Sequence, residues 1–385
     1  MEISRESLPL HLQVRLKIED YLCTLSEGDK IPGGEMGLCR KLGVSRITVR
    51  RALGDLADEG ILSSCQGKGT FLKKRPMKKE RNATSRIGLL VPEINNSFIA
   101  RIVKGVENEI SRRDYELIFS HYQSSDPELQ FSKLNQMLER GVDGIIIYPA
   151  APTACRAKHV ELFRRAESMN IPVIFVDHYF PEVNAMSVMT DNVAGMYMAT
   201  DHLIKLGRRK FALLGFGKDA GIVDQQRRMG FQNALSDYKM KPNPVLEAEL
   251  GVAGHETSAK RLVQEWIRKF NRRLPFDSIV CMQDNMAYGA FLALGEAGLK
   301  VPEDVALVGY DNLAMEAYKI IGLDLTSVDQ PAEEMGAESS RILINHLEGI
   351  SPIVNSRHIL LKPKLVERSS CGEKIKSVPG LMLKK

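Results

Sequence analysis

The chain of 385 residues has no long apolar run and few aromatic side chains. Its longest apolar stretches, such as "GIIIYPAAP", are interrupted by proline and are strand-sized, well short of the ~18 residues that span a bilayer. The N-terminal segment "MEISRESLPL" lacks the apolar core of a secretory signal. These absences argue against a membrane partner and predict a cytoplasmic protein.

The sequence also lacks the motifs of metal sites and hydrolases. Its six cysteines include no CxxC pair and none lies at metal-ligand spacing from a histidine, so we expect reduced, mostly buried thiols. The eight histidines form no HExxH motif, and no GxSxG motif is present. We therefore expect no metal, no cofactor and no enzymatic activity.

What the chain does contain is an ordinary globular composition with an uneven charge. Apolar residues make up 44% and charged residues 26%, and the length suggests two or three domains. Residues 1–86 carry 17 basic and 11 acidic side chains, a net charge of +6, whereas the rest of the chain carries −1. A basic small part joined to a neutral large part indicates an anionic partner for the small part.

Helical and strand patterns alternate in two distinct ways along the chain. The N-terminal part predicts helices followed by a β-hairpin with a Gly-Lys-Gly turn, which is the order of a winged helix-turn-helix: helices at 8–27, 35–42 and 46–59, strands at 61–65 and 70–73. From Arg86 on, apolar strands alternate with amphipathic helices, which predicts parallel sheets covered by helices. About 280 residues exceed one doubly wound sheet, so we expect a two-lobed α/β domain.

These patterns define the expected domains. The highly charged segment that includes "KKRPMKKERNATSR" has no apolar periodicity and is typical of a linker. The expected boundaries are a winged helix-turn-helix domain at 1–73, a linker at 74–86, a two-lobed domain at 87–370 and a tail at 371–385. A weak internal repeat places Asp177 and Asp311 after equivalent strands, at the cleft mouth of each lobe.

The stretch "LGVSRITVRRAL" (42–53) is the first candidate site. Ser45 suits a helix N-cap, so Arg46 lies in the first turn, where backbone N–H groups favour phosphate. Arg50 shares the face of Arg46, and Thr48 and Arg51 share the adjoining face, all away from the apolar stripe. Arginine contacts phosphate or guanine, although a basic helix face is often merely solvated.

Together with "PLHLQV" and "QGKGTFL", this stretch resembles the DNA-binding domain of the gluconate-repressor (GntR) family over about residues 8–73. The resemblance implies DNA contacts in and beside the major groove and a wing tip near the minor groove: Arg40, Ser45, Arg46, Thr48 and Arg50, with Gly67, Lys68 and Gly69. The segment "IPGGEMGL" is one residue longer than the family pattern, but Glu35 is kept.

The larger part resembles the effector domain of the lactose-repressor family over about residues 86–368, on motifs that include "GVDGIIIYPA", "IPVIFVDHYF" and "VPEDVALVGYDN". This resemblance implies a periplasmic-binding-protein fold with a sugar between its lobes. The implied effector-binding residues are Ser97, Phe98, Asp177, Asp191, Gln283, Asp284, Asp311 and Gln330, with Arg227 or Arg228 as a cation.

Carboxylates and amides suit the hydroxyl groups of a sugar, and Phe98 could pack on its C–H face. Each aspartate has an alternative role as a helix cap or in an ion pair between the lobes, and Asp191 suits the cap of the helix at 192–206. The motif "GFGKDAG" (215–221) has one residue too many for a dinucleotide site, and Trp266 lies at core spacing.

The sequence thus predicts a homodimeric regulator, a repressor of carbohydrate-utilisation genes, which binds operator DNA and is released by a small arabinose-like sugar. Two alternatives stay open: the ligand acts as a co-repressor, or the chain is a sugar-binding receptor that binds nucleic acid only non-specifically.

Overall fold

The structure is a computed structural model that describes residues 14, 15, 17, 18, 21, 22, 25–58, 60–65, 69–73, 84–94, 96–123, 126–149, 156–216, 221–240, 245–248, 255–313, 318, 320–353 and 357–372. Contacts between Cα atoms divide the chain into two compact units, Met1–Thr84 with Ile344–Ile353, and Ser85–Leu343 with Val354–Lys385.

The first unit holds an antiparallel hairpin and the helices packed on it. Leu62 lies opposite Leu72 in the hairpin, and both side chains are buried. The predicted stripe of the third helix is in the core, namely Val49, Ala52, Leu53 and Leu56. This order of elements confirms the winged helix-turn-helix prediction: α2 (Gly34–Leu42), α3 (Arg46–Asp58), β1 (Leu62–Cys65) and β2 (Gly69–Leu72).

The second unit contains two six-stranded sheets, one in each lobe. In the first lobe the order is β13-β7-β6-β5-β3-β4 and every pair is parallel. Its strands are β3 (Arg86–Val91), β4 (Glu116–His121), β5 (Gly144–Ile147), β6 (Val173–Val176), β7 (Met186–Thr190) and β13 (His358–Leu361). Its helices are α4 (Ser97–Ile110), α5 (Pro127–Glu139), α6 (Arg156–Ser168) and α12 (Ala332–Leu347).

In the second lobe the order is β14-β12-β11-β10-β8-β9, and β14 alone among these described strands runs antiparallel to its neighbour. The strands are β8 (Phe211–Phe216), β9 (Val245–Ala248), β10 (Ser278–Cys281), β11 (Ala306–Tyr310), β12 (Thr326–Asp329) and β14 (Lys364–Val366). The helices are α7 (Asn192–Lys205), α8 (Ile222–Asp237), α9 (His255–Lys269), α10 (Asp284–Glu296) and η3 (Ser369–Cys371).

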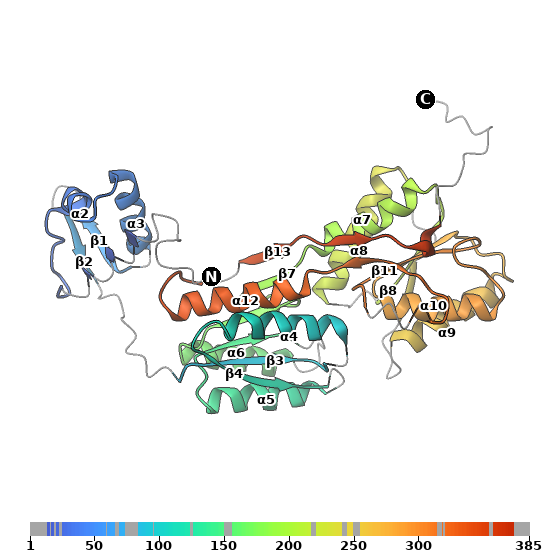
Figure 1. The fold of residues 1–385 in the computed structure, drawn as a ribbon, viewed down its shortest axis with the longest axis horizontal. Coiled ribbons are helices and arrows are strands. Elements are labelled where there is room, and N and C mark those ends of the chain that lie inside the picture. Colours follow the sequence, from blue (N-terminus) through green and yellow to red (C-terminus); the bar gives the residue numbers. More distant parts are fainter. Residues whose placement is uncertain are drawn as a thin grey trace, which may run out of the picture. The chain divides into compact units, whose positions relative to one another are not determined.

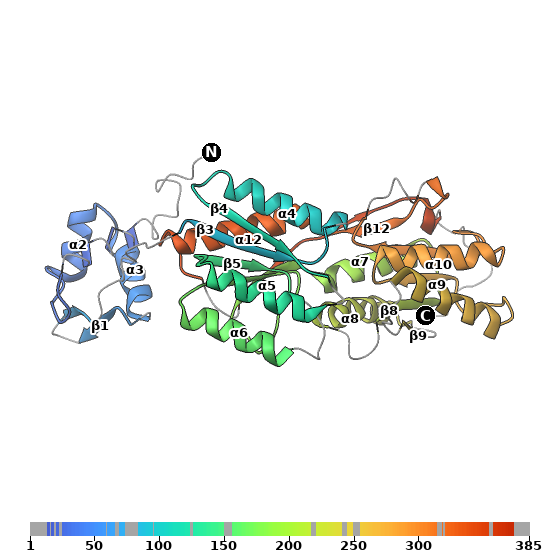
Figure 2. The ribbon, with the colours of Figure 1, turned by 90° about the horizontal axis from the view of Figure 1, so that it is seen from below.

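Helices cover both faces of each sheet, as the alternating pattern predicts. Figures 1 and 2 show α4 and α12 on one face of the first sheet and α5 and α6 on the other. In the second lobe α7 packs with α8 and α9 with α10. Because both faces are covered, strands such as β5 and β11 are buried along their whole length. This explains why they are continuous apolar runs in the sequence.

The chain crosses between the two lobes three times among the described elements: from β7 to α7, from β12 to α12 and from β13 to β14. The sequence analysis did not predict β7, β9, β12, β13, β14 or α12, because their apolar patterns are short or adjoin the crossings. Asp177 follows β6 in one lobe and Asp311 follows β11 in the other, so each lies at the carboxyl end of a parallel strand.

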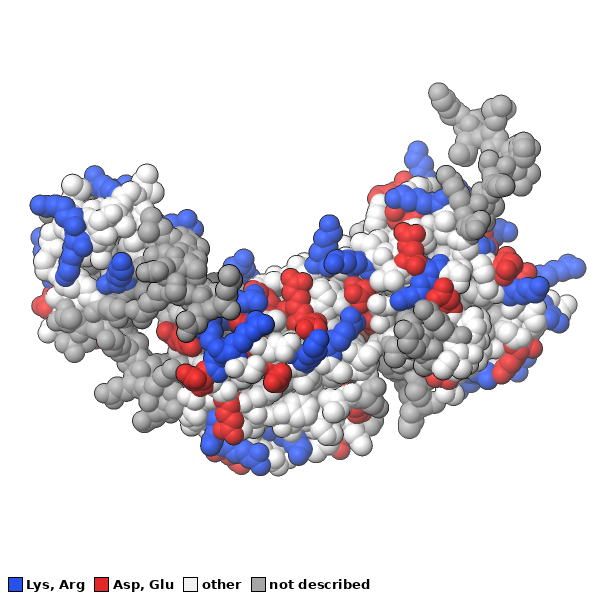
Figure 3. Space-filling model, in the orientation of Figure 1, with Lys and Arg blue, Asp and Glu red and all other residues white. Residues whose placement is uncertain are grey.

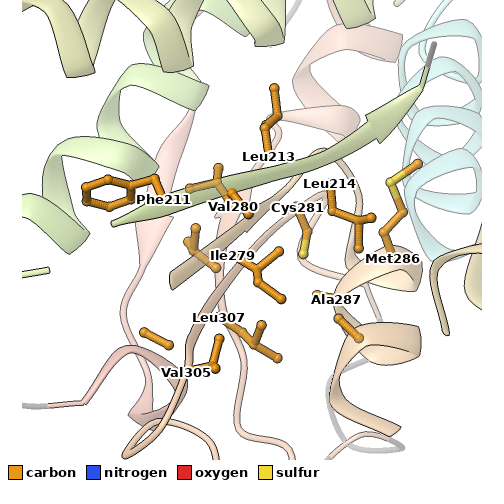
Figure 4. Close-up of a cluster of buried hydrophobic side chains, with 14 of the residues drawn as sticks. Phe211, Leu213, Leu214, Ile279, Val280, Cys281, Met286, Ala287, Val305 and Leu307 are labelled. Carbon is orange, nitrogen blue, oxygen red and sulfur yellow. The ribbon is translucent and has the colours of Figure 1, made fainter. Parts of the chain in front are cut away.

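The core of the second lobe is formed by apolar side chains of β8, β10 and β11 that pack against α10 (Figure 4). Cys281 belongs to this cluster, and Cys39, Cys281 and Cys371 are free thiols. Trp266 lies against the same core with its ring centroid 5.2 Å from that of Phe276, which favours packing over ligand stacking. None of the described helices is long and apolar enough to cross a membrane.

Candidate functional site

The amino end of α3 presents the polar side chains that the sequence singled out. Ser45 caps the helix, because its Oγ accepts a hydrogen bond from the Thr48 backbone N–H at 3.3 Å. Arg46, Arg50 and Arg51 are exposed, while the opposite face of α3 is buried. Lys and Arg side chains gather on the visible face of this unit, with few acidic ones between them (Figure 3).

Glu35, at the start of α2, holds two of these arginines. Its Oε2 accepts hydrogen bonds from Arg46 Nε at 2.8 Å and Arg50 Nη2 at 3.1 Å, and its Oε1 accepts one from Arg50 Nε at 3.2 Å. Arg50, and then Arg46, lower the pKa of the Glu35 carboxyl. The arginine side chains remain 61% and 62% exposed. The carboxylate therefore orients two guanidinium groups and leaves them open to solvent.

The longer "IPGGEMGL" segment has a structural explanation. Gly33 and Gly34 adopt left-handed backbone conformations, with φ of 72° and 53°. A Cβ on Gly37 would lie 2.8 Å from the Pro32 carbonyl oxygen, so only glycine fits there without a shift. The three glycines make room for the extra residue while Glu35 stays in the first turn of α2, opposite α3.

The other residues assigned to this surface are less constrained. Arg40 is exposed and its Nε donates to the Met36 carbonyl oxygen at 3.5 Å. Gly69 begins β2 with φ of 113°, and a Cβ there would lie 2.6 Å from the Lys30 side chain. Gly67 and Lys68, the expected wing tip, lie outside the described residues.

In the second unit, Arg227 is the centre of a buried polar cluster. Its side chain is 3% exposed and lies over the Tyr310 ring, with the guanidinium carbon 3.8 Å from the ring centroid. Its Nε donates to Asn192 Oδ1 at 2.9 Å and its Nη1 to the Met282 carbonyl oxygen at 2.6 Å. Its Nη2 lies 3.4 Å from Asp311 Oδ1. Of the two arginines left open by the sequence, Arg227 is the buried one.

Asp311 joins this cluster from the end of β11. Its Oδ1 also accepts a hydrogen bond from Gln330 Nε2 at 2.7 Å. Burial raises the pKa of the Asp311 carboxyl to about 6, although Arg227 acts to lower it. The residue is strained, because its φ of 104° is rare for a side chain with a Cβ.

Asp177 approaches the same cluster from the first lobe. Its φ is 65° and it is 2% exposed. His178 Nε2 lies 3.3 Å from Asp177 Oδ2. Burial acts to lower the pKa of Arg227, but Asp311, Tyr310 and Asp177 raise it overall, so charges from both lobes share one space. Among the described residues, neither Asp177 Oδ1 nor Gln330 Oε1 has a hydrogen-bond partner, although both are buried.

The other two predicted aspartates, Asp284 and Asp191, accept hydrogen bonds from groups of the second lobe. Asp284 is fully buried, and its oxygens accept from the Leu313 backbone N–H and the Ser327 hydroxyl, both at 2.7 Å. Asp191 Oδ1 accepts from the Ala194 backbone N–H at 2.9 Å, so the cap of α7 is present. These bonds favour structural roles over contact with a ligand.

The remaining predicted residues lie at helix starts. Ser97 is the first residue of α4, and Phe98 is buried, its backbone N–H bound to Asn96 Oδ1 at 2.8 Å. Gln283 precedes α10, and its Oε1 is hydrogen-bonded to His255 Nδ1 at 2.5 Å.

Sequence reasoning missed several members of the cluster. Asn192 holds Arg227, and Asp224 lies in the first turn of α8, where burial raises the pKa of its carboxyl. Tyr148 follows β5, and burial together with Asp177 raises the pKa of its phenol well above the ordinary value. Each of these residues follows a strand or lies at the start of a helix, and this position is the sequence signal that could have identified it.

Comparison with known proteins gives these sites a context. Residues 84–360 match the family described as periplasmic binding proteins and sugar binding domain of LacI family. Residues 11–72 match bacterial regulatory proteins, gntR family. The arabinose metabolism transcriptional repressor of Geobacillus stearothermophilus is 29% identical over 96% of this chain and 100% of its own length.

Two further relatives match about three quarters of the chain. The ribose operon repressor of Haemophilus influenzae is 29% identical over 74% of this chain and 81% of its own. A LacI-family transcriptional regulator from Enterococcus faecium, solved with bound ribose, has a TM-score of 0.61 at 25% identity and covers 76% of this chain and 100% of its own.

The described part of the chain contains no group of three or more potential ligands that could hold a metal ion. The two matched segments contain the described residues of both candidate sites. The chain therefore belongs to the family of periplasmic binding proteins and LacI-type sugar-binding domains, carries a GntR-type helix-turn-helix, and is a transcriptional regulator rather than an enzyme.

Proposed function

We propose that the chain represses carbohydrate-utilisation genes and leaves its operator when a small, uncharged, arabinose-like sugar binds beside Arg227 and Asp311. One observation carries the sugar proposal: two buried acceptors, Asp177 Oδ1 and Gln330 Oε1, have no donor among the described residues. A buried unpaired acceptor is unfavourable, so the site calls for a ligand that supplies hydrogen-bond donors. A sugar supplies several hydroxyl donors at once.

The proposed effector site comprises Ser97, Phe98, Asp177, Arg227, Gln283, Asp311 and Gln330. Asp191 and Asp284, whose oxygens are already bonded within the chain, support its walls rather than the ligand. The relatives named as arabinose and ribose repressors support a pentose.

The proposed operator site is the surface of α3 with the residues that flank it. Arg46 and Arg50, oriented by Glu35, point their open guanidinium groups toward bases or phosphates, and Ser45, Thr48, Arg51 and Arg40 contribute further polar contacts. The proposed operator site also includes Gly67, Lys68 and Gly69, of which the structure describes Gly69. The proposed domains are those predicted from the sequence: 1–73, 74–86, 87–370 and 371–385.

A homodimer would set two such surfaces on a pseudo-palindromic operator. The site of action would be the cytoplasm, because the operator is there. There are two alternatives. In the first, the ligand promotes operator binding as a co-repressor. In the second, the chain is a sugar-binding receptor that binds nucleic acid only non-specifically. A footprint that protects one symmetric site supports the regulator, and uniform protection along the DNA overturns it.

A thermal-shift screen of pentoses, hexoses and nucleosides identifies the ligand, because one that binds only the folded state raises the melting temperature. At 100 times its Kd such a ligand adds about 2.7 kcal/mol to the stability. If nucleosides alone raise the melting temperature, the proposal that the effector is a sugar is contradicted.

Two substitutions separate the two sites. Arg50→Ala should weaken operator binding at fixed salt and leave sugar binding intact. Asp311→Ala should leave operator binding intact and abolish the response to L-arabinose, because it removes the carboxylate beside Arg227. Gel-shift titrations with and without the sugar measure both effects, and an Asp311→Ala protein that is still released by sugar would refute the cleft assignment.

A further inference from the structure

Arg101, on α4, makes two contacts that connect the first lobe to the candidate effector site. Its Nη1 donates to Asp329 Oδ1 at 2.8 Å, and its Nη2 donates to the Asp311 backbone carbonyl oxygen at 3.1 Å. Both side chains of the ion pair are largely shielded, with exposures of 31% and 28%. One guanidinium group thus holds the backbone of Asp311 and the end of β12 together.

The two contacted residues adjoin the proposed sugar-binding groups. The Asp311 side chain is bonded to Arg227 and Gln330, and Gln330 directly follows Asp329 at the crossing from β12 to α12. A sugar that donates hydroxyls to Asp311 and Gln330 would therefore act on both residues beside the Arg101 contacts.

The backbone at this point is held in an unusual conformation. Asp311 and Asn312 both have positive φ, 104° and 48°. Asn312 Nδ2 donates to Asp329 Oδ1 at 3.2 Å, and Arg368 Nη2 donates to Asn312 Oδ1 at 2.8 Å. Strained residues persist only where their surroundings hold them, and Arg101 contacts the Asp311 backbone from the other lobe.

The helix α4 packs without a gap against the segment that follows Asp329. A Cβ on Gly105 would lie 2.0 Å from the Glu333 carbonyl oxygen, and a Cβ on Gly336 would lie 2.1 Å from the Ile102 carbonyl oxygen. Two helices at such close approach move together, because packed interiors do not deform continuously. In the sequence, α4 follows β3, the first strand after the expected linker at 74–86.

We propose that Arg101 is a positioning residue that transmits sugar binding at Asp311 and Gln330 to α4, and through it to operator affinity. The inference rests on the proposed function. In this role Arg101 fixes the Asp311 carbonyl and the Asp329 carboxylate relative to α4. Without it, a change of the Asp311 backbone on sugar binding would not act directly on α4.

The test compares Arg101→Ala with Lys104→Ala in the full-length protein. Lys104 is a matched control, because it lies one turn along the same helix and pairs with Glu333 at 3.0 Å, away from Asp311. Fluorescence anisotropy measures affinity for the footprinted operator duplex with and without L-arabinose, and calorimetry measures L-arabinose affinity. Typical allosteric couplings change affinity ~5–150-fold.

For the wild type and Lys104→Ala we expect L-arabinose to change operator affinity by a factor in this range. In Arg101→Ala we expect operator affinity to become nearly independent of L-arabinose, while calorimetry still detects sugar binding. Asp329→Asn, which removes the same ion pair from the other side, should behave likewise, and Arg101→Lys should restore only part of the coupling because an ammonium lacks the two-pronged geometry.

Three outcomes overturn the inference. An Arg101→Ala protein that keeps the wild-type coupling shows that Arg101 is not needed. A Lys104→Ala protein that loses the coupling equally shows that any disturbance of α4 suffices. If the wild type itself binds no L-arabinose or is not released by it, the proposed function falls, and the inference falls with it.

Discussion

Asp311 is the residue at which the chemistry of the candidate effector site is concentrated. It is 7% exposed and lies 3.4 Å from Arg227, so it combines the cost of burying a carboxylate with a compensating ion pair. Removing one partner of such a pair leaves a buried charge uncompensated and costs about 3–5 kcal/mol. Arg227→Ala leaves the Asp311 carboxyl without this partner and Asp311→Asn leaves the Arg227 guanidinium without it, so we expect each variant to be less stable than the wild type.

Burial raises the pKa of Asp311 to about 6 from its ordinary value of 3.8, which predicts a pH dependence of sugar binding. The ionised carboxylate accepts two or more hydroxyl donors, whereas the protonated acid uses one of its oxygens as a donor. L-arabinose affinity should therefore fall as the pH is lowered from 7.5 to 5. Calorimetry at intervals across this range measures it, and a flat profile would contradict the assignment.

The same shift has the opposite sign for folding. Asp311 binds its proton more tightly in the folded state than in the unfolded state, so its contribution to stability grows as the pH falls from about 6 toward 4 and is lost as the pH rises through 6. Denaturant titrations at a series of pH values measure the free energy of unfolding, and Asp311→Asn should remove this contribution to its pH dependence. If the pH dependence is unchanged in that variant, the effect belongs to another group.

At the scale of the element, α2 depends on its glycine-rich start to place Glu35. Gly33 has φ of 72°, and a Cβ on it would lie 2.9 Å from the Gly37 Cα. An L side chain is strained in this conformation and has no room, so a substitution must shift the first turn of α2 and with it Glu35.

Gly33→Ala is expected to destabilise the first unit and to weaken operator binding, because Arg46 and Arg50 lose their orienting carboxylate. Gly54→Ala is the control: Gly54 lies within α3, nothing lies within 4 Å of its Cβ position, and alanine favours a helix over glycine by roughly 1 kcal/mol. Thermal melts and gel shifts of both variants measure the effects. Equal operator affinity in the two variants would mean that the start of α2 does not position the arginines.

At the scale of the whole molecule, regulation is a coupling between two binding events. If sugar binding releases the protein from its operator, the sugar and the operator must prefer different conformations of the protein. The coupling must then be reciprocal: if L-arabinose lowers operator affinity by some factor, the operator lowers L-arabinose affinity by the same factor.

We expect calorimetric titration of L-arabinose into the protein–operator complex to give a weaker affinity than titration into the free protein, by the factor that gel shifts give for the operator. A scrambled duplex of equal length is the control and should leave sugar affinity unchanged. Unequal factors would show that the released species differs from the free protein, for example in its oligomeric state.

Much of the fold follows from local patterns. The stripe at Val49, Ala52, Leu53 and Leu56 is periodic, and strands such as β5 and β11 are continuous apolar runs. The helices of the α/β part other than α12 lie where the alternating pattern predicts them. The short edge strands β9 and β14 were missed, because three or four residues carry too little periodicity to stand out.

The sequence by itself determined the two kinds of domain, most of their helices and the Ser45 cap, because these depend on residues that are neighbours along the chain. Only the tertiary structure decided which polar residues meet. It brought Arg227 to Asp311 across 84 positions and Arg101 to Asp329 across 228 positions. In the tertiary structure both oxygens of Asp284 accept hydrogen bonds from within the chain, whereas Asp177 Oδ1 has no partner among the described residues. The physical reason is that a hydrogen bond depends on distance in space, which no local pattern of polar residues encodes.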